Sequence, residues 1–335
     1  MPLRNYGVLA ARVLDTRAEG GSGAPHFQIR ARGGDVDFRV AVNVLSQQSP
    51  SELLYAADEA FEHPVLNALP DLPDGFSGLP STPGQGAFDY IRGNLFDRES
   101  LRPLPATAPG PDNDLADKLH HYVDRAQADP SARLYAFGER WGPEDGLADK
   151  IFGFSPGNGV HDIHMNQGNT GRFTRDDGVW QDGGLLLNFP DAQQWVAIFL
   201  AFQSQAWHTD DRTGHTLPAA RAVGADAGPE VPDHLVRIVA ALVADGGRPT
   251  VTLLNTGPRD IELAGWSLSD VREHRMPLPA GRLRAGDTAR IAVRPGVLLD
   301  DAGGLLTLLD PAGLKVDGVA YTRRQAREPG RTIVF

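Results

Sequence analysis

The 335-residue sequence contains no cysteine, which excludes disulfide bonds, thiolate nucleophiles and cysteine-based zinc or iron–sulfur sites. No segment approaches the roughly 18 uninterrupted apolar residues that a membrane-spanning helix needs, and residues 1–10 show no apolar core of signal-peptide length. Basic residues are fewer than acidic ones: the sequence has 32 lysines and arginines and 43 aspartates and glutamates, which gives a formal net charge of −11. This balance gives no overall attraction for a polyanion. The absences together predict a cytoplasmic protein without a membrane span.

The length and the patterning of the chain predict two domains. A chain of 335 residues exceeds the usual size of one hydrophobic core, and its 41% apolar residues are enough to fill two. Residues 218–233 are rich in alanine, glycine, proline and charge, without periodicity, which is typical of a linker. We therefore expect an N-terminal domain over residues 1–217, this linker, and a C-terminal domain over residues 234–335.

The N-terminal domain is expected to be α+β with a mainly antiparallel sheet. Alternating apolar residues predict a meander of three strands within residues 6–45, and a central strand, apolar on both faces, within residues 195–207. Residues 49–52 resemble a helix start, so we expect a helix from residue 53. A second helix is predicted from about residue 111 to residue 128, on one apolar stripe. Further strands are expected at residues 133–139, 151–154 and 184–189.

The C-terminal domain is expected to be all-β. Short β-rich runs recur at regular spacing, with a type I turn signature at residues 310–313. Several short strands with such turns over about 100 residues predict a sandwich of two sheets. The expected strands cover residues 235–243, 250–255, 261–268, 289–293, 305–309 and 316–321.

Residues 159–169 are the stretch where chemistry is most expected, because they combine two imidazoles, one carboxylate and three side-chain amides between glycines. Metal binding, phosphate binding and acid–base catalysis all use imidazoles that second groups hold in place. If the run is extended, Asp162, His164 and Asn166 share one face, while His161 and Ile163 share the other. If it is helical, His161 and His164 share a face, although the glycines disfavour a helix.

A second cluster, residues 207–215, again carries two histidines and two aspartates, and we expect the two clusters to meet at neighbouring strand ends. These polar residues allow three interpretations: a divalent metal site, metal-free catalysis by paired imidazoles, or a hydrogen-bonded structural network. The candidate catalytic residues are His161, His164 and His208. The candidate metal ligands are Asp162, His164, His208 and Asp210, and the candidate substrate-binding residues are Asn166, Gln167, Asn169, Gln203 and Gln205.

Two functions follow from these residues. The first is a hydrolase for a small polar or phosphodiester substrate, such as a metal- or histidine-dependent phosphodiesterase or nuclease, with a divalent metal ion as one option for its cofactor. The second is a noncatalytic ligand-binding or interaction protein whose polar cluster is structural.

Two family resemblances add to this interpretation. Residues 253–257 (LLNTG), 261–270 (IELAGWSLSD), 283–287 (LRAGD), 308–310 (LLD) and 316–321 (VDGVAY) resemble a bacterial lamin tail domain. That resemblance implies an immunoglobulin-like accessory module that contacts a protein or surface partner and has no active site. Residues 49–55 (SPSELLY), 89–97 (DYIRGNLFD), 110–114 (GPDND), 137–142 (FGERWG), 159–169 and 202–211 (FQSQAWHTDD) resemble the YukJ-like bacterial family, which is defined by sequence and implies no particular activity.

Overall fold

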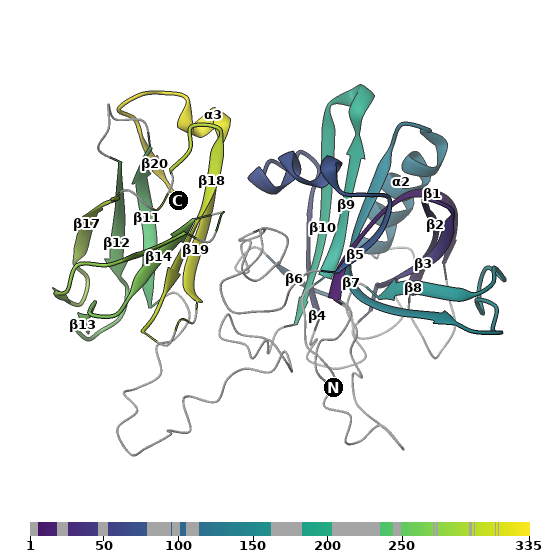
Figure 1. The fold of residues 1–335 in the computed structure, drawn as a ribbon, viewed down its shortest axis with the longest axis horizontal. Coiled ribbons are helices and arrows are strands. Elements are labelled where there is room, and N and C mark those ends of the chain that lie inside the picture. The colour runs from purple at the N-terminus through teal and green to yellow at the C-terminus, as the bar shows by residue number, and fades with distance from the viewer. Residues whose placement is uncertain are drawn as a thin grey trace, which may run out of the picture.

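The structure is a computed structural model in which the chain forms two groups of strands, each with its own hydrophobic core (Figure 1). The described residues up to 202 form the N-terminal domain, and the described residues from 235 onward form the C-terminal domain. The predicted linker lies outside the described residues, so the boundary at residue 217 stays a prediction. The described residues are 6–18, 26–45, 53–78, 95, 101–104, 114–161, 183–202, 235–243, 249–270, 272, 274–294, 297, 299–311, 313 and 315–335.

The N-terminal domain consists mainly of strands. These are β1 (Tyr6–Ala18), β2 (His26–Gly33), β3 (Val36–Asn43), β4 (Leu53–Asp58), β5 (Gly75–Gly78), β6 (Arg102–Pro103), β7 (Arg133–Glu144), β8 (Gly157–His161), β9 (Gly183–Phe189) and β10 (Gln194–Phe202). Its helical elements are the 3-10 turns η1 (Pro64–Asn67), η2 (Leu69–Asp71) and η5 (Pro190–Ala192), and the α-helix α2 (Asp114–Ala128).

A closed barrel lies at the centre of this domain. The strands form one ten-stranded sheet in the order β5-β1-β2-β3-β8-β7-β9-β10-β4-β6, and β1 also pairs with β7. That additional pairing closes β1, β2, β3, β8 and β7 into a five-stranded ring. Within the ring only β3 and β8 run parallel. The predicted antiparallel meander is confirmed, because β1, β2 and β3 are consecutive neighbours.

Strand β10 shows why both faces of the sheet are apolar. Val196 and Ile198 pack into one core together with the apolar stripe of α2, whereas Ala197 and Phe199 pack into a second core that includes residues of η1 and η2. Successive side chains of a strand point to opposite faces, so a strand covered on both sides needs apolar residues throughout. The expectation of a doubly covered central strand is confirmed, as is the helix that ends at Ala128.

The helix expected from residue 53 is wrong, because this segment is β4. It pairs with β10 in antiparallel register, from Leu53 opposite Phe202 to Asp58 opposite Ala197. All six residues of the segment pair with β10 on one edge and two pair with β6 on the other, and this tertiary pairing outweighs the local helix-start signal.

Two further expectations need correction. The strand expected at residues 151–154 is a turn, in which the Asp149 carboxylate accepts the amides of Ile151 and Phe152. The α+β label overstates the helix content, because the described part of the chain is mostly β and α2 is its one helix of more than four residues. The mainly antiparallel sheet is confirmed.

The C-terminal domain contains only short elements. They are β11 (Val236–Leu242), β12 (Thr250–Asn255), β13 (Ile261–Glu262), β14 (Ser267–Asp270), β15 (Arg275–Pro277), β16 (Arg282–Leu283), β17 (Thr288–Ala292), β18 (Gly303–Leu309), β19 (Lys315–Thr322), α3 (Arg323–Ala326) and β20 (Thr332–Val334). Each predicted strand has a counterpart here, although the one expected at residues 261–268 is divided between β13 and β14.

These strands form two four-stranded sheets, β17-β12-β11-β20 and β15-β14-β18-β19, and the short pair β13-β16, all antiparallel. Both four-stranded sheets contribute to one core, in which Trp266 and Tyr321 are among the largest buried side chains. The buried Asp317 of β19 joins the sheets, because its carboxylate accepts the amide of Ile238 at 2.5 Å. That amide lies where the β11 register shifts before Ala240, so the carboxylate satisfies a donor at an irregular point of the sheet.

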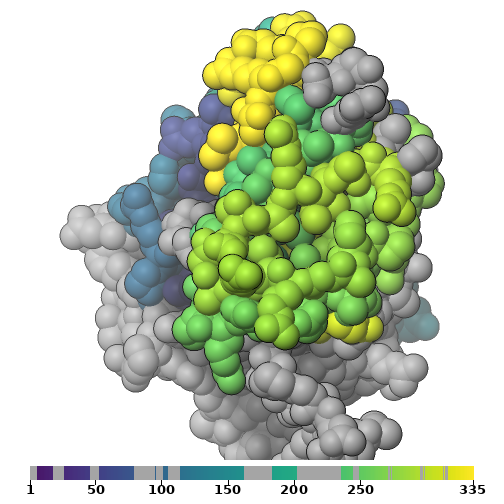
Figure 2. All heavy atoms as spheres, turned by 90° about the vertical axis from the view of Figure 1, so that its left-hand side faces the viewer, coloured from purple at the N-terminus to yellow at the C-terminus, as the bar shows by residue number. Residues whose placement is uncertain are grey.

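The two domains also contact each other. Arg324 of α3 donates to Glu62, just before η1, at 3.1 Å, and Figure 2 shows the α3 end of the C-terminal domain, in yellow, beside the purple residues of this region. Both side chains are mainly exposed, so the ion pair itself contributes little stability. Among the described helices, none is long and apolar enough to cross a bilayer.

Candidate functional site

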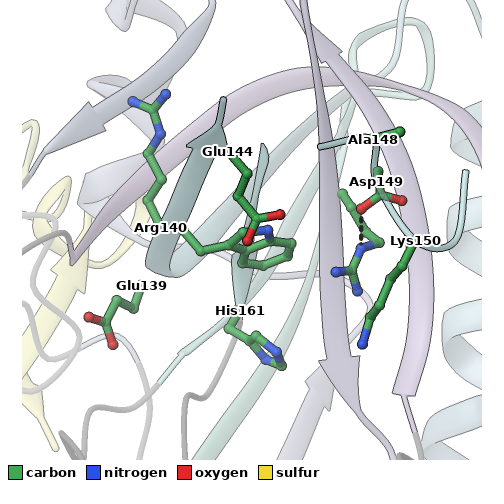
Figure 3. A pocket seen from close by; sticks show the side chains of 9 residues that line it. Glu139, Arg140, Glu144, Ala148, Asp149, Lys150 and His161 are labelled. Atoms are coloured by element: carbon green, nitrogen blue, oxygen red, sulfur yellow. Dashed lines mark hydrogen bonds and ion pairs between the residues drawn. The ribbon is translucent and has the colours of Figure 1, made fainter. Parts of the chain in front are cut away.

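The described residues include a pocket of about 400 Å³ on the outside of the barrel, where β3, β7 and β8 lie side by side. The loop between β7 and β8 forms its other wall. Three barrel strands therefore supply the floor and one loop supplies a side (Figure 3). The lining residues are Arg39, Glu139, Arg140, Trp141, Glu144, Ala148, Asp149, Lys150 and His161.

Strand alternation decides which side chains reach this pocket. Val40 of β3 is opposite Val160 of β8, and both are fully buried in the barrel core. Their neighbours Arg39 and His161 therefore point to the other face of the same strands. Arg39 lies on the more polar face of β3, but it is only 7% exposed, because Trp141 and the β7–β8 loop cover it.

Trp141 forms the floor between these two residues. Its indole crosses β8 at Gly159, with the Arg39 guanidinium 4.7 Å and the His161 ring 5.4 Å from its centroid. A Cβ atom at Gly159 would lie 2.0 Å from the indole and 2.3 Å from the Arg39 carbonyl oxygen. Glycine is thus required at position 159 for the ring to lie flat against the strand.

A buried ion pair holds the loop against the barrel. Arg39 Nε donates to Asp149 at 2.7 Å and Arg39 Nη1 donates to Gln28 at 3.0 Å. The side chains of Arg39 and Asp149 are only 9% and 1% exposed. Asp149 also accepts the amides of Ile151 and Phe152 at 3.0 and 2.8 Å. Both oxygens of this carboxylate therefore accept hydrogen bonds within the protein, as a buried charge requires.

The loop is fixed at further points as well. Asp149 N–H donates to the Phe154 carbonyl and Gly157 N–H donates to the Leu147 carbonyl, both at 2.7 Å. Arg17 of β1 stacks on Phe152, at 5.1 Å from its ring centroid. The wall of the pocket is therefore built in advance of any ligand.

His161 is the half-buried imidazole of the pocket. It lies opposite Glu139 across the β7–β8 pair, and its ring meets that of His26 edge to face at 5.2 Å between centroids. An imidazole accepts or donates a proton near neutral pH, so this position is suited to acid–base chemistry. Figure 3 shows Lys150 and His161 reaching toward the same end of the pocket, with Glu139 on the opposite side of His161 from Lys150.

Only one predicted site residue, His161, falls within the described residues, and it lines the pocket. The predicted meeting of His164 with His208 stays a prediction. In the described part of the chain no three histidine, aspartate or glutamate side chains form a metal-binding group. The other predicted residues lie outside the described ranges: Asp162, His164, Asn166, Gln167, Asn169, Gln203, Gln205, His208 and Asp210.

The sequence prediction missed Arg39, Asp149 and Lys150. Arg39 lies on the polar face of its strand, and its partner Asp149 lies 110 residues away in the sequence. No local pattern marks such a pair. The one available signal was the arginine itself, a long charged side chain beside the valines of the strand.

The comparisons with known proteins concern the N-terminal domain. The family described as "Uncharacterized conserved protein (DUF2278)" matches residues 1–214. The "Uncharacterized protein YukJ" of Bacillus subtilis (strain 168) is 46% identical over 214 residues, which cover 63% of this chain and 93% of that protein. The family match includes all the pocket residues and ends before the C-terminal strands. The resemblance to a YukJ-like family is thereby confirmed, and this chain belongs to the DUF2278 family.

Proposed function

We propose that the N-terminal domain binds a small polar ligand in the pocket beside His161. The observation that carries this proposal is the convergence of Arg39, Trp141 and His161 on one pocket of about 400 Å³. Ligand pockets commonly have volumes of roughly 300–1,000 Å³, with an apolar surface and a few fixed polar groups. Here Trp141 supplies the apolar surface, and the Arg39–Asp149 pair fixes one polar group before a ligand arrives.

A group that is fixed before the ligand arrives favours binding, because the protein then loses less conformational entropy when the ligand binds. Binding is our first proposal, because it uses only residues that the structure describes.

Hydrolysis is our second proposal, and the position of His161 supports it. His161 is a predicted catalytic residue, it lines the pocket, and Glu139 lies directly opposite it in the sheet. Imidazole–carboxylate pairs serve as general acids and bases. In this proposal His164, His208, Asp162 and Asp210 complete the site as catalytic groups or as ligands of a divalent metal ion, and the substrate is a small polar molecule or a phosphodiester.

The variant His161→Gln separates these two functions. We expect it to weaken ligand binding about tenfold, because one hydrogen bond of the pocket is lost. The measurement is an NMR titration with a panel of phosphates, carboxylates, sugars and amines. If the chain also hydrolyses bis(p-nitrophenyl) phosphate, the same variant should lower that rate by about 100-fold or more.

His120→Gln is the matched control, since His120 lies on α2 with its side chain 47% exposed. It should behave as wild type. If no member of the panel binds at millimolar concentration, the binding proposal is wrong.

Metal analysis tests the version of the hydrolase that uses a divalent metal ion. This version requires stoichiometric metal in the wild type and its loss in both His164→Ala and His208→Ala.

We also propose that the C-terminal domain is an immunoglobulin-like, lamin-tail-like sandwich that serves as an accessory module toward a protein or surface partner. Its two four-stranded antiparallel sheets around one core support this proposal. A chain that ends at residue 217 should then bind pocket ligands with an affinity within about twofold of the full chain, because distant sites act independently. A large loss of affinity on truncation would argue for a direct role in the site.

A further inference from the structure

One nitrogen of the buried Arg39 remains available to a ligand. Nε donates to Asp149 and Nη1 donates to Gln28, whereas Nη2 has no hydrogen-bond partner within the described ranges. The side chain is only 9% exposed and it lines the pocket, where Nη2 is the nitrogen left for a ligand. A guanidinium that is held at two of its nitrogens presents the third as a fixed positive donor to a ligand.

Lys150 adds a second positive group to the same pocket. Its side chain is exposed, and none of the residues that the structure describes forms an ion pair with it. Figure 3 shows Lys150 reaching toward the end of the pocket where His161 lies. Two cationic donors and an imidazole therefore share this part of the pocket.

The three acidic residues of the pocket differ in how far they offset the positive charges of Arg39 and Lys150. Asp149 is already used by Arg39 and two backbone amides. Glu139 also lines the pocket, but Figure 3 shows it on the opposite side of His161 from Lys150. Glu144 is the acidic group that faces a ligand, and its Oε2 lies beside Gly157. Cationic groups thus dominate the Lys150 end, while Glu144 reduces the affinity of the pocket for anions.

We propose that the pocket recognises an oxyanion, a phosphate or a carboxylate group of the ligand, between Arg39 Nη2 and Lys150 Nζ, with His161 as a neighbouring donor. The proposal rests on the proposed binding function and names the chemistry of the ligand. Charge-assisted hydrogen bonds from arginine and lysine are the common means of holding phosphate and carboxylate. Because Arg39 is also held by Asp149, it cannot turn away from the ligand.

The test is a titration of the full chain, followed by NMR or calorimetry, with inorganic phosphate, phenyl phosphate, dimethyl phosphate and acetate. Saturable binding that weakens with added salt is expected, since the attraction between exposed charges is screened. Tighter binding of the phosphates than of acetate identifies a phosphate ligand, and the reverse order identifies a carboxylate ligand. Either order supports the oxyanion site.

Two loop variants and one control test the assignment of residues. Lys150→Gln should weaken oxyanion binding about tenfold, and Glu144→Gln should strengthen it about threefold, because one removes an attractive charge and the other a repulsive one. Lys118→Gln should match wild type, since Lys118 lies on α2, paired with Glu59. These three side chains are exposed or half-exposed, so folding is preserved.

Unchanged affinity in Lys150→Gln, or no oxyanion binding at all, would overturn the inference. If oxyanions fail to bind while sugars or amines from the panel do, only the oxyanion inference is lost. If nothing binds, the proposed function is lost with it.

Discussion

Asp149→Ala is expected to lower the free energy of unfolding of the N-terminal domain by about 3–5 kcal/mol, which is the usual cost of removing one partner of a buried ion pair. The substitution leaves the Arg39 guanidinium buried without its carboxylate, since the Arg39 side chain is 9% exposed. It also removes the acceptor for the amides of Ile151 and Phe152. The pocket wall should loosen, and urea denaturation of the full chain measures the loss.

Three further variants sharpen this prediction. Asp149→Asn keeps an acceptor for the two amides, so it should be less destabilising than Asp149→Ala. The double variant Arg39→Met/Asp149→Leu should recover much of the stability, because apolar replacements of a buried pair are often tolerated. Glu328→Ala breaks an exposed pair with Arg331 and should leave the denaturation midpoint unchanged. Equal midpoints for wild type and Asp149→Ala would contradict the account of this loop.

Gly159→Ala is expected to destabilise the N-terminal domain by about 1–3 kcal/mol, the usual cost of overpacking, and to remove the pocket. The new methyl group would lie 2.0 Å from the Trp141 indole and 2.3 Å from the Arg39 carbonyl oxygen. The backbone of β3 cannot move away without breaking its pairing with β8, so the indole must leave. Arg39 and His161 then lose the ring that separates them.

Tryptophan fluorescence and ligand titration measure this outcome. An indole moved into solvent should emit at longer wavelength, and ligand affinity should fall with the loss of the pocket floor. Gly78→Ala is the matched control, because a Cβ atom there meets no atom within 4 Å. Wild-type fluorescence and affinity in Gly159→Ala would show that Trp141 does not form the floor.

The sequence predicted the elements whose defining pattern lies within one short segment of the chain. The helix α2 was predicted because its acidic first turn and apolar stripe lie within fifteen residues. The doubly apolar β10 was predicted from its composition alone. By contrast β4 was mistaken for a helix, because what makes it a strand is the edge of β10, about 140 residues later in the chain.

The barrel and the pocket depend on long-range pairings that no local pattern reveals. Closure requires β1 to pair with β7, and the pocket requires Arg39 to meet Asp149, which is 110 residues away. Residue type alone made His161 a candidate site residue, and the structure adds that it lines the pocket. The role of Gly159 was invisible in the sequence, since it depends on an indole from another strand.

The most direct test of the central claim, that the barrel-wall pocket is the functional site, is an NMR titration of the ¹⁵N-labelled full chain with inorganic phosphate. The account predicts saturable shifts at the Trp141 indole N–H, the Arg39 Nε–H and the amides around Lys150, with the Trp266 indole of the C-terminal core unchanged. Shifts confined to other regions would contradict it, and so would the absence of any saturable shift with phosphate, acetate and the rest of the ligand panel.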